Sequence, residues 1–160
     1  MSNKLEISLL GKLRREPLVN AALNIIPTFT GWDVDPTNPE NATDGNPTTV
    51  TGTGSKTVAG TGAFGNFKLI LPSYSTYLIT LKVGLWSTTG SHRIYINTNA
   101  DGVNFTSTSF AITNVTQTTE YVHNTLSFVG SFDTILFPFN PTGAGTYYLK
   151  IYEINAFKLK

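Results

Sequence analysis

The chain has 160 residues, of which 13% are charged and none is cysteine, and its formal net charge is +1. This length suits one self-sufficient hydrophobic core and is short for two. The balanced charge argues against nucleic acid as a partner, and the missing cysteines exclude disulfides, thiolate nucleophiles and cysteine zinc sites. No apolar stretch approaches the roughly twenty residues of a membrane helix, so we expect no membrane insertion.

Residues 1–24 differ in character from the rest of the chain. Leu5, Leu9 and Leu13 recur at helical spacing before Pro17, which predicts a short amphipathic helix. Four of the eleven Lys and Arg residues stand in the first fifteen positions, as suits an anchoring segment. The sequence leaves two roles open, an arm that folds back on its own domain and an arm that docks onto another subunit. We find no pattern of a cleaved signal peptide.

The stretch 41–49, Asn-Ala-Thr-Asp-Gly-Asn-Pro-Thr-Thr, places side-chain oxygens at Asp44, Asn46 and Thr49 around Gly45. Calcium prefers oxygen ligands, and a tight turn lets neighbouring residues all face inward. The same residue types are ordinary turn formers, so an Asx-type turn between strands is the alternative. Acidity is concentrated in this region. Four acidic residues lie within twelve positions that contain no Lys or Arg: Asp33, Asp35, Glu40 and Asp44.

From about residue 64 onward the apolar residues recur with a period of two, which is typical of half-buried antiparallel strands. The expected apolar faces are Tyr77, Ile79, Leu81 and Val83; Ile94 and Ile96; and Val122, Leu126 and Phe128. Turn-forming residues separate these strands at 87–91, 97–104 and 140–145, and the Thr- and Gly-rich stretch 48–65 is expected to be a long surface loop. Short strands and frequent turns predict an all-β sandwich.

Three local motifs, in order along residues 25–160, resemble those of the galactose-binding-like β-sandwich superfamily. This superfamily includes discoidin or coagulation-factor type C domains and many bacterial carbohydrate-binding modules. Residues 41–49 resemble its early Ala-x-Asp-Gly-(Asp/Asn)-x-x-Thr loop, residues 95–105 its central strand and Ser-x-Asp-Gly-x-Asn-(Trp/Phe) turn, and residues 148–157 its closing strand. The resemblance implies an antiparallel jelly-roll β-sandwich of about eight strands over 25–160, preceded by the arm 1–24.

The resemblance also implies a structural calcium site that joins the first and last strands. Its ligands would be the side chains of Asp44, Asn46, Thr49 and Glu153 and the backbone carbonyls of Asn41 and Tyr152. Glu153 also continues the apolar face of Tyr147, Leu149 and Ile151, where an unpaired carboxylate would be costly to bury. The alternative is that Glu153 pairs with Lys150 or points to solvent. Asn46 stands where the family often has an Asp, which weakens the expected binding.

Sugar-binding members of the superfamily place an aromatic ring beside planar polar side chains at the loop end of the sandwich, where the ring stacks on the sugar and the polar groups bind hydroxyls. The candidates here are Trp32, Trp86, His92, Arg93, Asn97 and Asn99. Trp86 is the strongest, because a strand runs into the turn 87–91 just after it. Its alternative role is that of a core residue at a strand end. Trp32 is expected to pack under the cation loop.

The sequence contains no recognisable catalytic constellation: no Gly-x-Ser-x-Gly, no His-x-x-x-His and no phosphate loop. We therefore expect no enzyme, and two compatible functions remain. One is a noncatalytic module that binds a cell-surface or polymeric glycan. The other is a structural or adhesive subunit anchored by residues 1–24, as in phage virion decoration, spike or tail proteins. We expect an oligomeric protein located on a virion or extracellular surface.

Overall fold

The computed structural model describes residues 18–60, 65–89, 92–94, 96–99, 106–108 and 118–159, with the backbone alone at 92–93, 96–99, 106–108 and 124–126. The predicted helix before Pro17 lies outside this part of the chain. The elements in order are β1 (Thr28–Thr30), the 3-10 helix η1 (Pro39–Ala42), β2 (Gly54–Val58), β3 (Gly65–Ser87), β4 (His92–Ile94), β5 (Ile96–Asn99), β6 (Thr106–Thr108), β7 (Tyr121–Pro141) and β8 (Gly145–Lys158). All the pairings are antiparallel, so the all-β prediction is confirmed. No helix among the described residues has the length and apolar character needed to cross a membrane.

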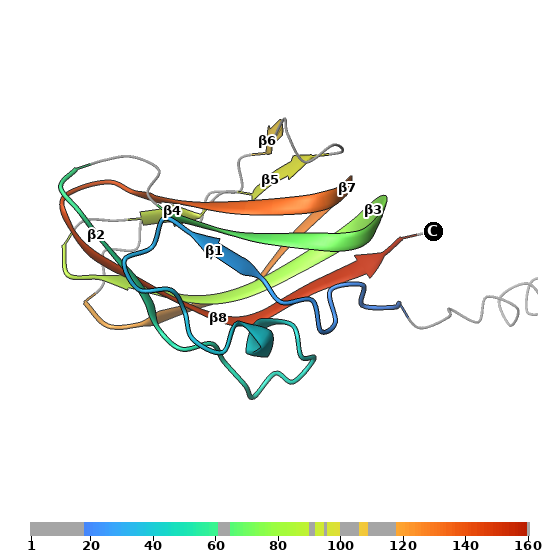
Figure 1. Ribbon diagram of the computed structural model, residues 1–160, viewed down its shortest axis with the longest axis horizontal. Coiled ribbons are helices and arrows are strands. Elements are labelled where there is room, and N and C mark those ends of the chain that lie inside the picture. The colour runs from blue at the N-terminus through green and yellow to red at the C-terminus, as the bar shows by residue number, and fades with distance from the viewer. Residues whose placement is uncertain are drawn as a thin grey trace, which may run out of the picture.

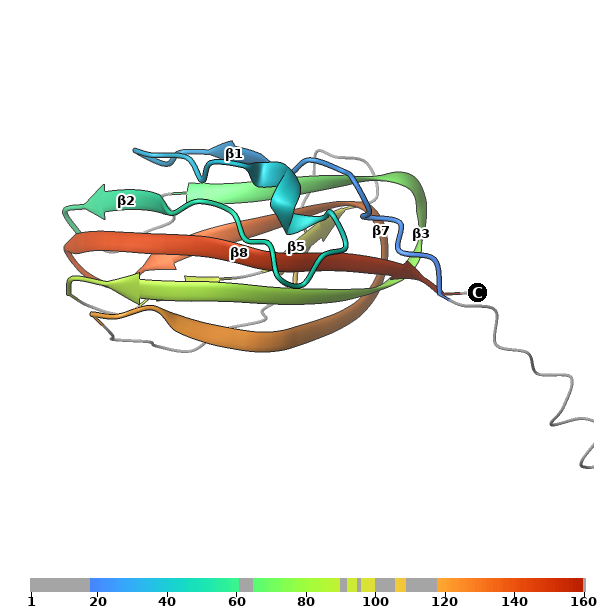
Figure 2. The ribbon, with the colours of Figure 1, turned by 90° about the horizontal axis from the view of Figure 1, so that it is seen from below.

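Two long strands, β3 and β7, pass through both layers of the sandwich (Figure 1). Their pairing breaks between Ile70 and Ser75 of β3, where the two strands bend together. Before the bend, β3 lies between β1 and the second half of β7. After it, β3 lies between β8 and the first half of β7, and β2 pairs with the other edge of β8. Figure 2 views this β2-β8-β3-β7 layer from outside.

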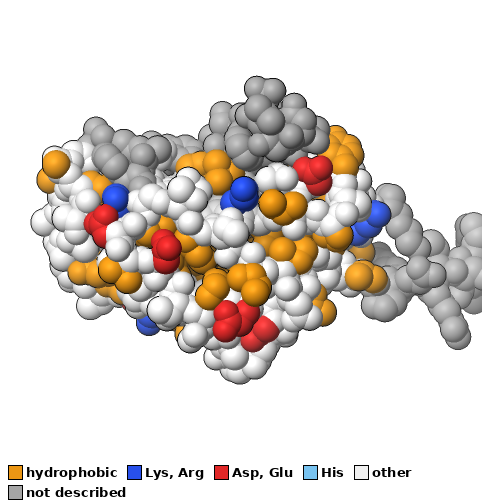
Figure 3. Space-filling model, viewed as in Figure 1, with side chains coloured by type: hydrophobic (Ala, Val, Ile, Leu, Met, Phe, Trp, Pro, Cys, Tyr) orange, Lys and Arg blue, Asp and Glu red, His pale blue; other side chains and the backbone are white. Residues whose placement is uncertain are grey.

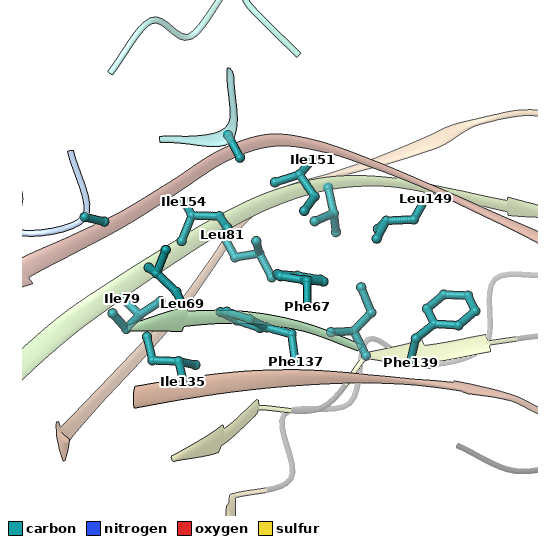
Figure 4. Close-up of a cluster of buried hydrophobic side chains, with 14 of the residues drawn as sticks. Phe67, Leu69, Ile79, Leu81, Ile135, Phe137, Phe139, Leu149, Ile151 and Ile154 are labelled. Atoms are coloured by element: carbon teal, nitrogen blue, oxygen red, sulfur yellow. The ribbon is translucent and has the colours of Figure 1, made fainter. Parts of the chain in front are cut away.

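The core fills the space between the two layers (Figure 4). Phe67 and Phe137 stack at its centre with ring centroids 4.4 Å apart. Alternate residues of each long strand point into it, and burying each such Leu, Ile or Phe contributes about 1.5–3 kcal/mol. The predicted apolar face of the central strand is confirmed, since these residues are buried: Tyr77, Ile79, Leu81 and Val83.

Two stretches expected to be loops or turns contain strands. Residues 54–58 form β2, although 48–65 was expected to be one surface loop, and residues 97–99 belong to β5. β2 is an edge strand whose side chains are mostly Ser, Lys and Thr, so it lacks an alternating apolar signal. In β5, pairing with β6 and β7 overrides the turn preference of asparagine.

A β-bulge in β8 changes the predicted position of Glu153. Lys82 pairs with Glu153 while the next residue of β3 pairs with Ile151, so Tyr152 is an extra residue in β8. Ile151 and Ile154 are both fully buried, and the two residues between them are half-buried. The prediction that Glu153 continues the apolar face of Ile151 is therefore wrong, because the bulge shifts the alternation by one residue.

A second bulge, in β7, has the same effect on the predicted face of Val122. β7 carries one more residue than β3 between the pairs Leu81–Leu126 and Val83–His123. As a result Val122 pairs with Gly84, whereas Phe128 pairs with the core residue Ile79. The expectation that Val122 shares a face with Phe128 is wrong for this reason.

The chain enters the domain alongside its last strand. Asn20 forms a bridge with Phe157 of β8, and its Oδ1 accepts hydrogen bonds from the backbone N of Ala156 (2.9 Å) and of Ala22 (3.1 Å). Its Nδ2 donates to Oδ1 of Asn155 at 2.8 Å. The start of the described chain and its C-terminal end therefore lie together at one end of the sandwich (Figure 2).

Candidate functional site

Trp86 and Tyr148 form a stacked pair on the outer face, which we define as the side of the β2-β8-β3-β7 layer turned away from the core. The two residues face each other across β3 and β8. The centroids of their rings are 5.1 Å apart, and the angle between the ring planes is 13°. Their neighbours Leu85 and Leu149 are fully buried, so the alternation of a strand turns both rings outward. Both rings are half-buried, and the alternative that Trp86 is a core residue is wrong.

A carboxylate lies beside the Trp86–Tyr148 pair. Glu120 packs over Gly84, where a Cβ atom would collide with its Oε1. Glu120 Oε2 accepts a hydrogen bond from Nζ of Lys150 at 3.1 Å, and its Oε1 accepts one from the hydroxyl of Tyr152 at 2.7 Å. The absence of a side chain at Gly84 thus gives the carboxylate its place on the sheet.

Two lysines lie over aromatic rings on the same face. Lys150 Nζ is 5.7 Å from the ring centroid of Trp86, and Lys82 Nζ is 5.2 Å from that of Tyr152. Cation–π attraction favours both arrangements. Each lysine is half-buried. The outer face therefore presents planar rings together with fixed hydrogen-bond donors and acceptors.

Burial raises the pKa of the Tyr152 phenol to about 12, and the hydrogen bond and negative charge of Glu120 act in the same direction. The ordinary value is 10.0. The pKa of Tyr152 is therefore higher in the folded chain than in the unfolded chain. The contribution of the protonated phenol to the free energy of unfolding is fully present below pH 10 and is lost as pH rises through about 12.

We expect an ultraviolet absorbance titration to show Tyr152 ionising near pH 12, and Tyr152→Phe to remove that part of the curve. Glu120→Gln should move the transition toward lower pH, because it removes the negative charge beside the phenol. A titration curve of Tyr152→Phe that keeps the wild-type transition would contradict this assignment.

The loop 41–49 adopts the turn that was the alternative to a cation site, and it gathers the proposed ligands as well. Asp44 Oδ1 accepts a hydrogen bond from the backbone N of Asn46 at 2.8 Å, and its Oδ2 accepts one from Oγ1 of Thr49 at 2.7 Å. Gly45 has φ +75°, a conformation that favours glycine. Asn46 Oδ1 accepts hydrogen bonds from the backbone N (3.1 Å) and Oγ1 (2.7 Å) of Thr48, so hydrogen bonds within the turn engage the side-chain oxygens at 44, 46 and 49.

The same loop is held against β8 beside the bulge. The backbone N of Thr51 donates to the carbonyl of Ile151 (3.0 Å), and the N of Ile151 donates to Oγ1 of Thr51 (2.9 Å). Asn41 Nδ2 donates to the carbonyl of Val50 at 2.9 Å. Acidic side chains gather over η1 and the loop that follows it (Figure 3). The residues that follow the turn therefore lie against β8 at Ile151, next to the bulge.

The oxygens gathered near the turn would give a hard cation few charges. The bulge leaves Tyr152 without a partner in the pairing with β3. Lys150 pairs with Glu120 rather than with Glu153, and the described part of the chain shows no ion pair for Glu153. No three His, Asp or Glu side chains of the described residues cluster. Backbone carbonyls and neutral oxygens would have to supply most of the ligands, as calcium allows.

The other predicted sugar-binding residues lie on β4 and β5. His92 and Arg93 pair with Pro141 and Asn140, and β5, which holds Asn97 and Asn99, pairs with the second half of β7. Their side chains lie outside the described part of the structure, so their role stays a prediction. Trp32 was expected to pack under the loop 41–49, but it borders the core against β3 and β7. Its Nε1 donates to the carbonyl of Asn66 at 3.0 Å, and its ring lies 5.1 Å from that of Phe139.

Sequence reasoning missed most of the residues around Trp86. Tyr148 and Lys150 lie beside it only because β3 and β8 pair in one particular register, and Glu120 comes from the segment before β7. Tyr148 and Lys150 alternate with buried residues of β8, which is a signal that they point away from the core. No signal in the sequence indicates which residue of β3 each of them faces.

No family model and no curated protein matches the sequence. Several solved structures are similar. Chitosan-binding module 1 of a chitosanase/glucanase from Paenibacillus sp. IK-5 has a TM-score of 0.52 at 19% identity, covering 87% of this chain and 98% of that one. A fucose-binding module from Streptococcus pneumoniae has a TM-score of 0.51 at 14% identity, covering 89% of this chain and 96% of that one. The lectin domain of Lectinolysin, complexed with Lewis B antigen, has a TM-score of 0.52 at 11% identity, covering 89% of this chain and 98% of that one.

The chain shares the fold of these three modules. The predicted antiparallel β-sandwich is therefore confirmed. Identities of 11–19% establish the fold and not the ligand. What this sandwich binds has to be argued from its own residues, and the outer face is where aromatic and polar groups converge.

Proposed function

We propose that the protein is a noncatalytic glycan-binding module and that the Trp86–Tyr148 pair stacks against a sugar ring. The observation that carries this proposal is the stacked, half-buried pair on the outer face, beside the hydrogen-bonded group of Glu120, Lys150 and Tyr152. The apolar face of a pyranose packs on a flat aromatic ring, while its hydroxyls require donors and acceptors nearby. The outer face supplies the aromatic surface and the donors and acceptors, on β3 and β8 and from Glu120 beside them.

The fixed geometry of this face favours binding. Glu120 is held by both Lys150 and Tyr152, so its carboxylate loses little conformational freedom when a hydroxyl donates to it. Lys150 can donate its remaining N–H groups to sugar oxygens. The similar modules are named for chitosan and fucose, and we propose a polymeric or cell-surface glycan as the partner here.

A glycan array probed with the full chain tests this function, with calcium and with a chelator in parallel. We expect binding to at least one class of glycan in the presence of calcium. Failure to bind any glycan under both conditions would overturn the proposal.

Such a negative result would favour the second candidate, an assembly subunit of a virion or another extracellular surface. The observation behind this candidate is a set of exposed apolar side chains where the chain enters the domain: Leu18 (54%), Val19 (73%), Leu23 (47%) and Ile26 (58%). Exposed apolar groups of this kind mark contact surfaces. Docking through residues 1–24 and an oligomeric state belong to this candidate.

We also propose that the turn 41–49 and the bulged part of β8 hold a structural calcium ion. Asp44, Asn46, Thr49 and Glu153 would supply side-chain oxygens, and the backbone carbonyls of Asn41 and Tyr152 would complete the shell. What supports this is the contact between the turn and β8 through Thr51 and Ile151. Bound calcium supplies positive charge and rigidity, and these residues would fasten the early loop to the last strand.

A further inference from the structure

We infer that the outer face binds an internal stretch of a linear glycan that lies along β3 and β8, rather than a single terminal sugar. This inference rests on the proposed function. It extends the site from the Trp86–Tyr148 pair to a second contact point, the ring of Tyr152 with Lys82 beside it. The substrate class would then be an unbranched polysaccharide.

The groups able to bind sugar are arranged in successive rows along the two strands. The pair of Trp86 and Tyr148 forms the first row, and Gly84 with Lys150 forms the second, where the carboxylate of Glu120 lies over the glycine. In the third row Lys82 pairs with Glu153, next to the extra residue Tyr152. We call these three rows the track. The Trp86–Tyr148 pair lies at one end of the track and the ring of Tyr152 at the other, with Lys150 and Glu120 in the middle row.

The strand positions of Trp86 and Tyr152 lie farther apart than one pyranose ring is wide. Tyr152 lies in the bulge beside Val83 and Lys82, three to four residues of β3 from Trp86. That separation is about 10–13 Å along a strand. A chain of several sugars can contact both rings while its hydroxyls meet Glu120 and Lys150.

The bulge is what makes the second contact point available. In a regular strand only one of two consecutive residues can face outward. Here Ile151 and Ile154 both enter the core, so Tyr152 and Glu153 between them are both directed away from it. Bulges commonly re-aim side chains near binding sites. Tyr152 gains its position on the outer face without any loss of buried apolar residues from β8.

The track continues beyond Tyr152 with polar groups. Asn155 Nδ2 donates to Oγ1 of Thr80 at 3.1 Å across β8 and β3, and Asn155 Oδ1 accepts from Nδ2 of Asn20 at 2.8 Å. These half-buried amides and hydroxyls are suited to hydrogen-bond sugar hydroxyls. Binding groups thus extend along the strand direction instead of converging on one pocket, as an internal stretch of a chain requires.

The test is calorimetry of the full chain with linear oligosaccharides of one to six units from four series, built of glucosamine, N-acetylglucosamine, glucose and galactose. We expect affinity in at least one series to rise with length up to about four units. Tyr152→Ala and Tyr152→Phe both remove the hydrogen bond from Tyr152 to Glu120, so the comparison of these two variants isolates the ring. Tyr152→Phe keeps the ring and should retain the gain in affinity with oligomer length, whereas Tyr152→Ala should lose about tenfold of that gain.

The failure of this inference differs from the failure of the proposed function. If the wild type binds a monosaccharide as tightly as the hexamer, or binds glycans on an array but none of the four series, the extended mode is overturned and the binding function stands. A length dependence that is the same in Tyr152→Ala and in wild type also overturns it. If no glycan binds at all, both fail.

Discussion

Replacing Trp86 by alanine is expected to weaken glycan binding at least about thirtyfold, because a central aromatic residue of a binding site typically contributes about 2 kcal/mol or more. The substitution removes the larger ring of the stacked pair and with it the surface on which a sugar would pack. It also removes the ring over which Lys150 lies, so this lysine would lose that contact and keep its ion pair with Glu120. Isothermal calorimetry with a glycan identified on an array measures the effect.

The fold should survive this substitution. Trp86 lies outside the core, and loss of its stacking on Tyr148 costs about 0.5–1.5 kcal/mol. Tyr74→Ala is the matched control, because Tyr74 is another aromatic residue of β3 but is 56% exposed and lies at the bend, away from the outer face site. Trp86→Phe keeps a ring and should restore part of the affinity. Wild-type affinity in Trp86→Ala would show that the sugar binds elsewhere.

The sequence predicts the type of fold because alternation is a local property. Tyr77, Ile79 and Leu81 alternate with polar residues, and that pattern alone identifies a strand with one buried face. It does not predict where a strand gains an extra residue. The bulges beside Lys82 are produced by pairing with two neighbouring strands, and they moved Glu153 and Val122 from their predicted faces.

The candidate site was predictable in part for the same reason. Trp86 could be singled out because an aromatic residue before a turn is noticeable in one segment. Its partner Tyr148 lies 62 positions later, and only the register of β3 with β8 brings the two together. Glu120 depends on a third segment and on the missing side chain of Gly84. Long-range pairing of this kind leaves no trace in a single sequence.

Calcium is expected to raise the melting temperature of the wild-type chain and to have no such effect on Asp44→Asn. At a concentration about a hundred times its Kd, a ligand that binds only the folded state adds about 2.7 kcal/mol to the free energy of unfolding. For a chain of this size that corresponds to a rise of roughly 5–11 °C. Differential scanning calorimetry with calcium and with a chelator measures the difference.

The physical reason lies in what Asp44 does in the turn. Its two oxygens already accept hydrogen bonds from Asn46 and Thr49, so the amide introduced by the substitution can keep one of these contacts while the negative charge is lost. The variant should therefore fold, with a melting temperature that calcium leaves unchanged. Asp35→Asn is the matched control, since Asp35 is an exposed acid of the same region outside the turn. An equal calcium response in Asp44→Asn and Asp35→Asn would place the ion elsewhere. A wild type indifferent to calcium would mean that hydrogen bonds alone hold the turn against β8.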